Sequence, residues 1–284
     1  FGPGTANDII ARQVAQDMTA TLGQSVIVEN RAGATGNIAA EYVAKSKPDG
    51  YTLLIGSLSN IINQATGNTT TDLTKDFAPV AFSGRTPYSF LVPKELPAKN
   101  VAELVELARK QPGRLNYGSG GTGGFSHLIT AYFELAANVR MTHVPYKGTG
   151  PALTDALGGQ LQVIFGSTPS TAPHAKSGRL RAIGVTSKTR SSALPDVPPI
   201  ADTVPGYYGP LLYGLWGPRG LPKEIVAWWN GEVAKLLRTA DMKEKMATAG
   251  IDPAGGAPAE FRDALKTDIE RWRKVIKDTG IQIE

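Results

Sequence analysis

Apolar residues recur at every fourth position near the start of the chain, with polar residues between them. The repeat is carried by Ile10, Val14, Met18 and Leu22. Side chains four residues apart lie on one face of a helix, so this spacing predicts an amphipathic helix over residues 6–22. Asn7 or Asp8 can cap its start, and Gly23 is expected to end it.

Short apolar runs alternate with another helical pattern in the region that follows. The pattern predicts a buried strand at 26–28, a helix at 38–45 and a strand at 52–55. Strands that alternate with helices form parallel sheets, so we expect a largely parallel sheet here. Residues 56–60, Gly-Ser-Leu-Ser-Asn, come directly after the second strand, at the end where open parallel sheets bind ligands.

A second run of alternating strands and helices occupies the middle of the chain. The predicted strands are 115–118, 141–144, 161–165 and 181–185. The predicted helices are 101–110, 125–136, 151–157 and 169–176. Because strands and helices alternate here as they do in the first region, the pattern predicts a second lobe.

Two longer extended segments, 81–92 and 211–216, are predicted to cross between the lobes. Helices near 222–237, 241–249 and 258–277 complete the chain. If these helices pack on the first lobe, that lobe is discontinuous. The expected division is residues 1–92 plus 212–284 for lobe 1 and residues 93–211 for lobe 2, which together describe a hinged α/β clamshell.

The composition narrows the class of protein mainly by exclusion. The 284 residues are 41% hydrophobic and 19% charged, which is typical of a globular protein, and they suffice for two lobes. No apolar run approaches the roughly 18 residues that span a bilayer. The absence of cysteine excludes disulfides, thiolate zinc sites and cysteine nucleophiles. The net charge of +5 is modest, and scattered Lys and Arg do not support nucleic-acid binding.

The first residues, Phe1-Gly2-Pro3-Gly4, form a turn without a strand before it. A loop of this kind normally follows a regular element. We therefore expect that a first strand, and with it a cleaved export signal, precedes the sequence as given.

A glycine-rich turn at residues 116–127, Asn-Tyr-Gly-Ser-Gly-Gly-Thr-Gly-Gly-Phe-Ser-His, separates a predicted strand from a predicted helix. Its glycines permit close approach of main-chain N–H groups to a ligand, and the helix directs its positive end at the same place. We favour an anion site, with a structural turn or a dinucleotide site as alternatives. Gly118 to Gly123 fits G-x-G-x-x-G, but residues 140–144, Arg-Met-Thr-His-Val, lack the acidic residue that dinucleotide sites place there.

Several other residues invite a chemical role and also have a simpler explanation. Asp8 lies in a first helical turn, where a capping role is commoner than acid or base catalysis. The three histidines are far apart in the sequence and give no metal spacing, although His127 lies close enough to bond to the loop or its ligand. Ser119 lacks the surroundings of a nucleophile, and no partner can be assigned to it. Phe125 either lines a ligand pocket or packs internally.

Ordered motifs along essentially the whole chain are similar to those of one family. They are the opening Phe1-Gly2-Pro3-Gly4-Thr5-Ala6-Asn7-Asp8, then Val28-Glu29-Asn30-Arg31-Ala32-Gly33, Pro48-Asp49-Gly50-Tyr51-Thr52-Leu53, His143-Val144-Pro145-Tyr146-Lys147-Gly148 and Ala193-Leu194-Pro195-Asp196-Val197-Pro198. In these motifs the chain resembles the extracytoplasmic solute receptors of tripartite tricarboxylate transporters, often called Bug receptors.

The resemblance implies a type II-like periplasmic binding protein that closes on a carboxylate and delivers it to a membrane permease. It implies a monomer in the periplasm, with mainly parallel sheets flanked by helices, without catalytic residues, cofactor or metal. It also places a strand before Phe1. The ligand-binding positions that it implies are Gly4, Thr5, Ala6, Asn7, Ser57, Ser59, Ser119, Gly121, Thr122, Gly123, Phe125, Ser126, His127, Gly166 and Ser167.

The chain departs from the family pattern at three of these positions. Thr5 stands where the family has the second of two glycines, and Gly166 where members often carry an aspartate that can pair with a ligand ammonium. Phe125 replaces a small hydroxyl residue. These departures predict a dicarboxylate or aromatic carboxylate ligand without an amino group. The alternative function is an enzyme that acts on a small anion or dinucleotide at the loop Gly118–Gly124.

Overall fold

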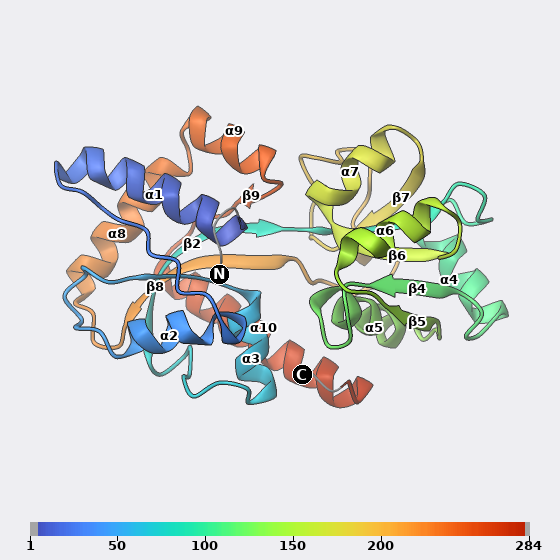
Figure 1. Cartoon of the computed structure of the whole chain (residues 1–284), viewed down its shortest axis with the longest axis horizontal. Coiled ribbons are helices and arrows are strands. Elements are labelled where there is room, and N and C mark those ends of the chain that lie inside the picture. Colours follow the sequence, from blue (N-terminus) through green and yellow to red (C-terminus); the bar gives the residue numbers. More distant parts are fainter. Residues whose placement is uncertain (1–4, 282–284) are drawn as a thin grey trace. The chain divides into compact units, whose positions relative to one another are not determined.

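The computed structural model describes residues 5–281 and divides the chain into two compact units (Figure 1). Unit 1 comprises Phe1–Arg85 and Leu211–Arg273, and unit 2 comprises Thr86–Pro210 and Lys274–Glu284. The first boundary therefore falls at 85/86, whereas the expected division had it at 92/93. The difference arises because the extended segment 81–92 contains parts of two strands, and the second of them lies in the sheet of unit 2.

Unit 1 is an α/β unit whose described strands pair in the order β1-β8-β2-β9. The strands are β1 (Leu54–Ser57), β2 (Phe77–Thr86), β8 (Leu211–Pro218) and β9 (Asp252–Pro253). The helices are α1 (Ala6–Leu22), η1 (Ala34–Gly36), α2 (Asn37–Ala44), α3 (Leu58–Thr66), α8 (Lys223–Leu236), α9 (Ala240–Thr248) and α10 (Pro258–Thr279), the last of which continues into unit 2. β1 pairs antiparallel with β8, and β2 pairs antiparallel with β9.

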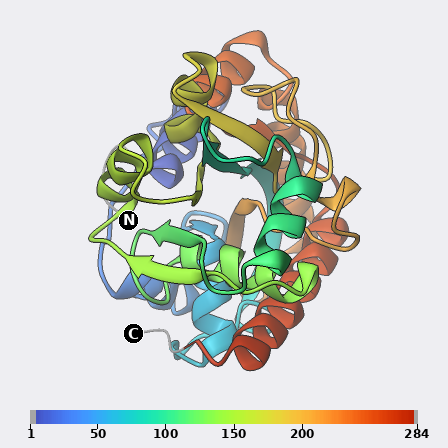
Figure 2. The ribbon, with the colours of Figure 1, turned by 90° about the vertical axis from the view of Figure 1, so that its right-hand side faces the viewer.

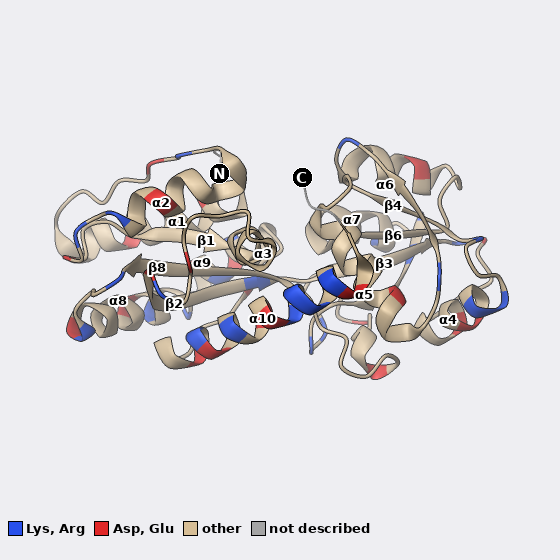
Figure 3. Cartoon of the chain, turned by 90° about the horizontal axis from the view of Figure 1, so that it is seen from below, with Lys and Arg blue, Asp and Glu red and all other residues tan. Residues whose placement is uncertain are grey.

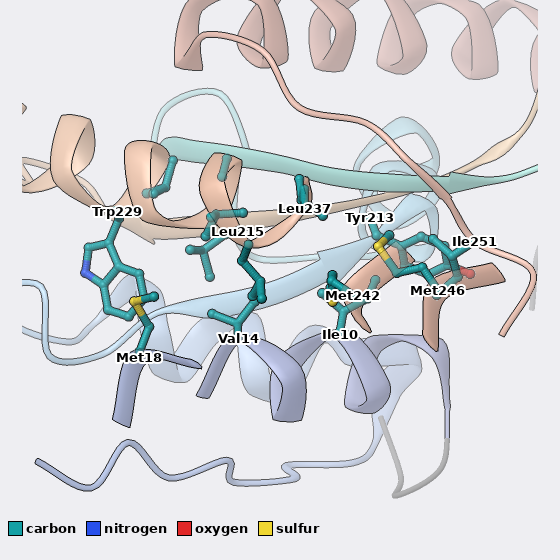
Figure 4. Packing of buried hydrophobic residues seen from close by; sticks show 14 of the residues in the cluster. Ile10, Val14, Met18, Tyr213, Leu215, Trp229, Leu237, Met242, Met246 and Ile251 are labelled. Atoms are coloured by element: carbon teal, nitrogen blue, oxygen red, sulfur yellow. The ribbon is translucent and has the colours of Figure 1, made fainter. Parts of the chain in front are cut away.

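Helix α1 confirms the amphipathic helix that the four-residue repeat predicted over residues 6–22. Thr5, not the expected Asn7 or Asp8, is its N-cap, and Gly23 ends it in the left-handed conformation as predicted. Ile10, Val14 and Met18 are buried against the side chains of β8, α8 and α9 (Figure 4). Leu22, the last apolar residue of the repeat, is 46% exposed, because it lies in the final turn beyond this core.

Two parts of the unit 1 prediction are wrong. Residues 26–28 form no strand, and the helix α3 begins within the segment 56–60, for which we predicted no helix. A strand needs a hydrogen-bonded neighbour, and the described residues provide none for this segment, in which Ile27 is 83% exposed. Helix α3 buries an apolar stripe that includes Leu58 and Ile61. The Ser, Asn and Gln residues between them make this stripe hard to recognise in the sequence.

Unit 2 has a five-stranded sheet in the order β5-β4-β6-β3-β7 among the residues described. Its strands are β3 (Tyr88–Pro93), β4 (Asn116–Ser119), β5 (Thr142–Pro145), β6 (Val163–Ser167) and β7 (Leu180–Val185). Its helices are α4 (Val101–Lys110), α5 (Phe125–Ala137), α6 (Thr149–Leu157), α7 (Thr168–Lys176) and η2 (Ile200–Asp202). β4 is parallel to β5 and β6, whereas β3 is antiparallel to β6 and β7. The sheets are therefore mixed and not mainly parallel, because the segments expected to cross between lobes take part in them.

The two faces of the unit 2 sheet pack against different helices. On one face Phe90 and Phe165 stack with ring centroids 4.1 Å apart, and Phe133 of α5 meets Phe90 edge-on. On the other face Leu91 and Ile164 pack against Ala152 and Ala156 of α6 and their neighbours. Figures 1 and 2 show α5 and α6 on opposite sides of β4. Successive side chains of a strand point to opposite faces of the sheet, so neighbouring residues of one strand pack into different hydrophobic cores.

Helix α10 buries one apolar stripe and exposes charges on its remaining surface. The buried residues are Phe261, Leu265, Ile269, Trp272 and Val275. Basic and acidic residues follow each other along its exposed side (Figure 3). Within residues 5–281, no helix is both long enough and apolar enough to cross a membrane.

Candidate functional site

The glycine-rich turn connects β4 to α5, as the sequence predicted. It consists of residues 120–124, between the last residue of the strand and the first residue of the helix. Gly121 and Gly123 have φ values of 134° and 74°, which side-chain-bearing residues rarely adopt. The turn therefore depends on glycine for its shape.

The loop holds its shape through hydrogen bonds to its own side chains. We expected the backbone N–H groups of this loop to face a ligand. Three of them instead donate hydrogen bonds to side chains of residues 119–127, and these bonds organise the loop. By contrast, the N-cap of α5 is a glycine and gives no side-chain bond to the first helical turn. The N–H groups of a first turn have no partner within the helix and attract anions. The loop bonds run from Gly120 N to Ser126 Oγ (2.9 Å), from Gly121 N to Ser119 Oγ (3.1 Å) and from Gly123 N to His127 Nδ1 (3.1 Å).

Two histidines lie stacked directly beside this loop. The rings of His127 and His143 have centroids 3.8 Å apart and planes inclined by 8°. The Nε2 atom of His143 is 2.6 Å from the Oγ atom of Ser119, and the Tyr117 ring stacks on the His143 ring with centroids 5.0 Å apart. The two histidines are far apart in the sequence but meet in the fold, because β4 and β5 are adjacent parallel strands with Tyr117 and His143 in register. His174 lies on α7, where it bonds to Arg179.

Burial keeps the stacked histidines neutral. It lowers the pKa of His127 to about 4, with a further contribution from the nearby His143. Burial also lowers the pKa of His143. In the same region burial raises the pKa of Glu134 to about 7 and raises the pKa of Tyr117. Near neutral pH the two histidines and Tyr117 are therefore uncharged, whereas Glu134 is about half ionised.

Ser119 and His143 resemble the nucleophile and base of a hydrolase, a partnership that the sequence did not reveal. However, Ser119 is fully buried, and its Oγ atom also accepts a hydrogen bond from Gly121 N. A nucleophile must be able to reach its substrate. The geometry thus gives Ser119 a structural role in the loop.

Phe125 and Tyr88 form an aromatic pair at the first residue of α5. Their ring centroids are 4.7 Å apart and the planes are nearly perpendicular, at 87°. Phe125 remains half-buried, whereas Tyr88 is buried. The Phe125 ring thus has a packing partner and an exposed part, and its predicted contact with a ligand stays a prediction.

Gly166 and Ser167 end strand β6, next to the start of α7. Gly166 is buried, and a Cβ atom there would lie 2.5 Å from the Cγ2 atom of Thr171. Ser167 is half-buried, and its hydroxyl lies 3.0 Å from that of Ser170. The space beside Gly166 is therefore filled by this chain's own threonine.

In unit 1, the predicted positions gather at the carboxyl end of β1. The Nδ2 atom of Asn7 donates to the carbonyl oxygen of Ile55 at 3.2 Å, which ties the first turn of α1 to this strand. Ser57 precedes α3, and its N–H donates to Asn60 Oδ1 at 3.1 Å. Two helices therefore begin at the end of one strand. Of the remaining predicted positions, Thr5 is exposed, Ala6 and Ser59 are half-buried, and Gly4 lies outside the described residues.

Asp8 has a structural role in the described arrangement. Its carboxylate accepts hydrogen bonds from Arg12 Nε and Asn30 Nδ2, both at 2.9 Å. These bonds connect α1 to the segment that follows it. Asp8 is 5% exposed, so we find no support for a role as an acid or base.

A cavity of about 340 Å³ lies within unit 1, between the segment 26–31 and β1. Its lining combines apolar residues, such as Val14 and Trp229, with polar ones, such as Asp8, Asn30 and Arg31. Residues 26–28 and β1 thus lie on the same cavity and do not pair with each other. The strand that we expect before Phe1 lies outside the described residues and stays a prediction.

Among residues 5–281, no three His, Asp or Glu side chains gather to hold a metal ion.

His143 and Tyr88 were not among the residues predicted for the site. His143 could have been found from its position in the strand that follows α5, since parallel neighbours of β4 bring their residues beside the loop. Tyr88 could not, because it lies on β3, whose place in the sheet depends on long-range pairing. Thr122 is the exposed tip of the loop.

Comparison with known proteins agrees with this architecture. Residues 10–281 match the model of the tripartite tricarboxylate transporter family receptor. The chain is 31% identical to protein BugT of Bordetella pertussis over 288 residues, covering 100% of this chain and 88% of BugT. A protein of R. palustris solved with adipate is 36% identical with a TM-score of 0.77, over 100% of this chain and 96% of that one. MatC from Rhodopseudomonas palustris, with bound malate, is 31% identical with a TM-score of 0.73, over 97% and 96%.

The match covers both units, and the fold is that of two-lobed periplasmic binding proteins. The chain therefore belongs to the tripartite tricarboxylate transporter receptor family of periplasmic solute-binding proteins.

Proposed function

We propose that this receptor binds a small carboxylate, with a dicarboxylate or aromatic carboxylate favoured over an amino acid, and delivers it to a tripartite tricarboxylate-type permease. The observation that carries the proposal is the start of α5, where a preorganised glycine loop leaves the first helical turn without a side-chain cap. Such a turn favours a carboxylate through its N–H groups and the helix dipole. The adipate and malate bound by two relatives support the same ligand class.

The residues proposed to form the ligand site lie at or just before helix starts in each unit. Fixed N–H groups and hydroxyls suit a receptor because they need no reorganisation when the ligand arrives. In unit 1 they are Gly4, Thr5, Ala6, Asn7, Ser57 and Ser59. In unit 2 they are Ser119, Gly121, Thr122, Gly123, Phe125, Ser126, His127, Gly166 and Ser167.

Thr122 and Phe125 are the strongest of the unit 2 set for direct contact. Thr122 is exposed at the tip of the loop, and Phe125 is half-buried at the first residue of α5. Ser119, Gly121, Gly123 and Ser126 are committed to bonds within the loop. We therefore assign these four to the shape of the site.

A thermal-shift screen tests the proposal. The panel contains mono-, di- and tricarboxylates, aliphatic and aromatic, with adipamide as the uncharged match for adipate. A ligand present at a hundredfold excess over its Kd stabilises the folded state by about 2.7 kcal/mol. We expect at least one carboxylate, but not adipamide, to raise the Tm. If no carboxylate on the panel shifts the Tm, the proposal fails.

Calorimetric titration tests the preference for ligands without an amino group. Gly166 is buried against Thr171, so the chain offers no carboxylate at this position to an ammonium group. We expect aspartate and glutamate to bind more weakly than the best dicarboxylate or aromatic carboxylate. Tighter binding of either amino acid than of every other carboxylate would refute this part of the proposal.

An enzyme acting on a small anion remains the competing function, since Ser119 and His143 lie in contact. The two functions differ in what becomes of the ligand. A receptor returns its carboxylate unchanged after long incubation, as NMR of the recovered compound would show. Chemical conversion of the carboxylate would favour the enzyme.

A further inference from the structure

We infer that His143 is a positioning residue that, together with His127, holds the glycine-rich loop in its ligand-binding shape. The inference rests on the proposed function for the meaning of the loop, but the contacts that carry it do not depend on which ligand binds. His143 itself lies beneath the loop and is not proposed to touch the carboxylate.

The first contact joins His143 to the end of β4. Its Nε2 atom is 2.6 Å from Ser119 Oγ, and that oxygen in turn accepts from Gly121 N at 3.1 Å. The Ser119 hydroxyl also lies 3.1 Å from the carbonyl oxygen of Gly121. His143 therefore fixes the Ser119 side chain, which bonds to both the N–H and the carbonyl group of Gly121.

The second contact joins His127 to the other end of the loop. Its Nδ1 atom accepts the N–H of Gly123 at 3.1 Å, which requires that this nitrogen carry no proton. The His127 and His143 rings stack nearly parallel with centroids 3.8 Å apart, so each imidazole restricts the orientation of the other. Both ends of the loop are thus attached to one pair of rings.

The surroundings of the pair favour its neutral form. Tyr117 of β4 stacks on His143, and Glu134 of α5 lies near Tyr117, with Arg140 close to Glu134. A second positive charge at 3.8 Å would repel the first, and a proton on His127 Nδ1 would face the Gly123 N–H donor. Acid should therefore loosen the loop before it unfolds the unit.

Amide hydrogen exchange of the full chain tests the positioning role without any ligand. In His143→Phe, which keeps the stacking shape but loses the bond to Ser119, we expect the protection factors of the Gly121 and Gly123 amides to fall about tenfold or more. His143→Gln places an amide near the position of Nε2 and should restore most of the protection. Wild-type protection in His143→Phe, or no rescue by His143→Gln, would overturn the inference.

A pH series separates positioning from simple packing. In the wild type, the protection factor of the Gly123 amide, corrected for intrinsic exchange, should decrease as the pH is lowered from 6.5 towards 4. His127→Asn, whose Oδ1 can accept the same N–H without titrating, should show no such decrease. An unchanged wild-type profile over this range would contradict the role of the pair.

His174→Gln provides the matched control, because it removes a histidine from α7 of the same unit, outside the loop. Its loop amides should exchange as in the wild type. Loss of loop protection in this variant would reveal a global effect and overturn the assignment to His143.

Calorimetry with adipate then links the loop to binding. We expect the Kd to rise about tenfold in His143→Phe and to change by less than about threefold in His143→Gln. Wild-type affinity in a His143→Phe protein whose loop amides are unprotected would refute the inference. If the wild type binds no carboxylate on the panel, the proposed function fails, while the exchange data still decide the positioning role.

Discussion

Gly166 and Thr171 fit together so closely that no side chain can be added at position 166 without displacing the threonine. A Cβ atom on Gly166 would lie 2.5 Å from Thr171 Cγ2. Thr171 cannot simply rotate away, because its Oγ1 atom bonds to Ser89 Oγ at 2.9 Å and to the Ser167 carbonyl oxygen at 3.1 Å. The pair thus ties the end of β6 to α7 and β3.

The first prediction concerns this contact. Gly166→Ala should lower the free energy of unfolding by about 1–3 kcal/mol, since the new methyl group overpacks a closed site. Thr171→Ser keeps the hydroxyl and removes the obstructing methyl. Urea unfolding of both single variants and the double variant should therefore show that the double variant loses less than the sum of the two.

Gly231→Ala in α8 is the control for this series. A Cβ atom there meets nothing within 4 Å, and alanine is the better helix former, so stability should be unchanged or slightly higher. Additive losses in the Gly166 and Thr171 cycle would mean that the two residues do not interact as described.

The second prediction concerns the start of α1. The hydroxyl of Thr5 accepts the N–H of Asp8 at 3.4 Å and caps the helix. Thr5→Ala should lower the free energy of unfolding by about 0.5–1 kcal/mol, whereas Thr5→Ser and Thr5→Gly should cost only a few tenths. Thermal unfolding of the three variants measures this order. A Thr5→Ala protein as stable as the wild type would show that the cap contributes nothing.

The third prediction concerns the exposed part of the Phe125 ring. Phe125→Leu removes the perpendicular contact with Tyr88 and, on our proposal, an aromatic wall of the ligand site. The Kd for an aromatic carboxylate such as benzoate should rise about three- to tenfold, and the Kd for malate should change less. Equal changes for the two ligands, measured by calorimetry, would indicate that the ring serves packing alone.

The fourth prediction concerns the pH dependence of stability, in which His127 and Glu134 oppose each other. The pKa of His127 falls from 6.5 to about 4 on folding, so its contribution to stability is lost as the pH decreases from 6.5 to 4. The pKa of Glu134 rises from 4.5 to about 7, so its contribution is lost as the pH increases from 4.5 to 7. His143, whose pKa burial also lowers, acts in the same direction as His127. The wild-type slope between pH 4.5 and 6.5 should therefore be the difference between the histidine and glutamate contributions.

Single substitutions should change this slope in opposite directions. In Glu134→Gln, the histidine contributions remain, and the free energy of unfolding should rise more steeply with pH between 4.5 and 6.5 than in the wild type. In His127→Asn, the slope should be less positive than in the wild type over the same range. Each change is at most about 1.4 kcal/mol per pH unit for a single group. Urea unfolding at four pH values measures the slopes, and changes of the same sign in the two variants would contradict the assignment.

The sequence by itself determined the elements with a strong local pattern. The helices 6–22 and 101–110 and the turn between β4 and α5 follow from apolar spacing, capping residues and glycines, all of which act within a few residues. The family motifs also identified the receptor class from the sequence. The strand predicted at 26–28 is absent because a strand depends on a hydrogen-bonded partner that is distant in the sequence. Helix α3 was not predicted because its many polar residues obscure the apolar stripe that it buries.

Only the tertiary structure decided which residues meet at the loop. His127 and His143 are distant in sequence, and they stack because β4 and β5 are parallel neighbours in register. Tyr88 reaches Phe125 through the antiparallel pairing of β3 in the centre of the sheet. Strand order depends on long-range burial and hydrogen bonding, which local patterns do not encode. The sequence thus located the glycine-rich loop, and the fold supplied the rings beside it.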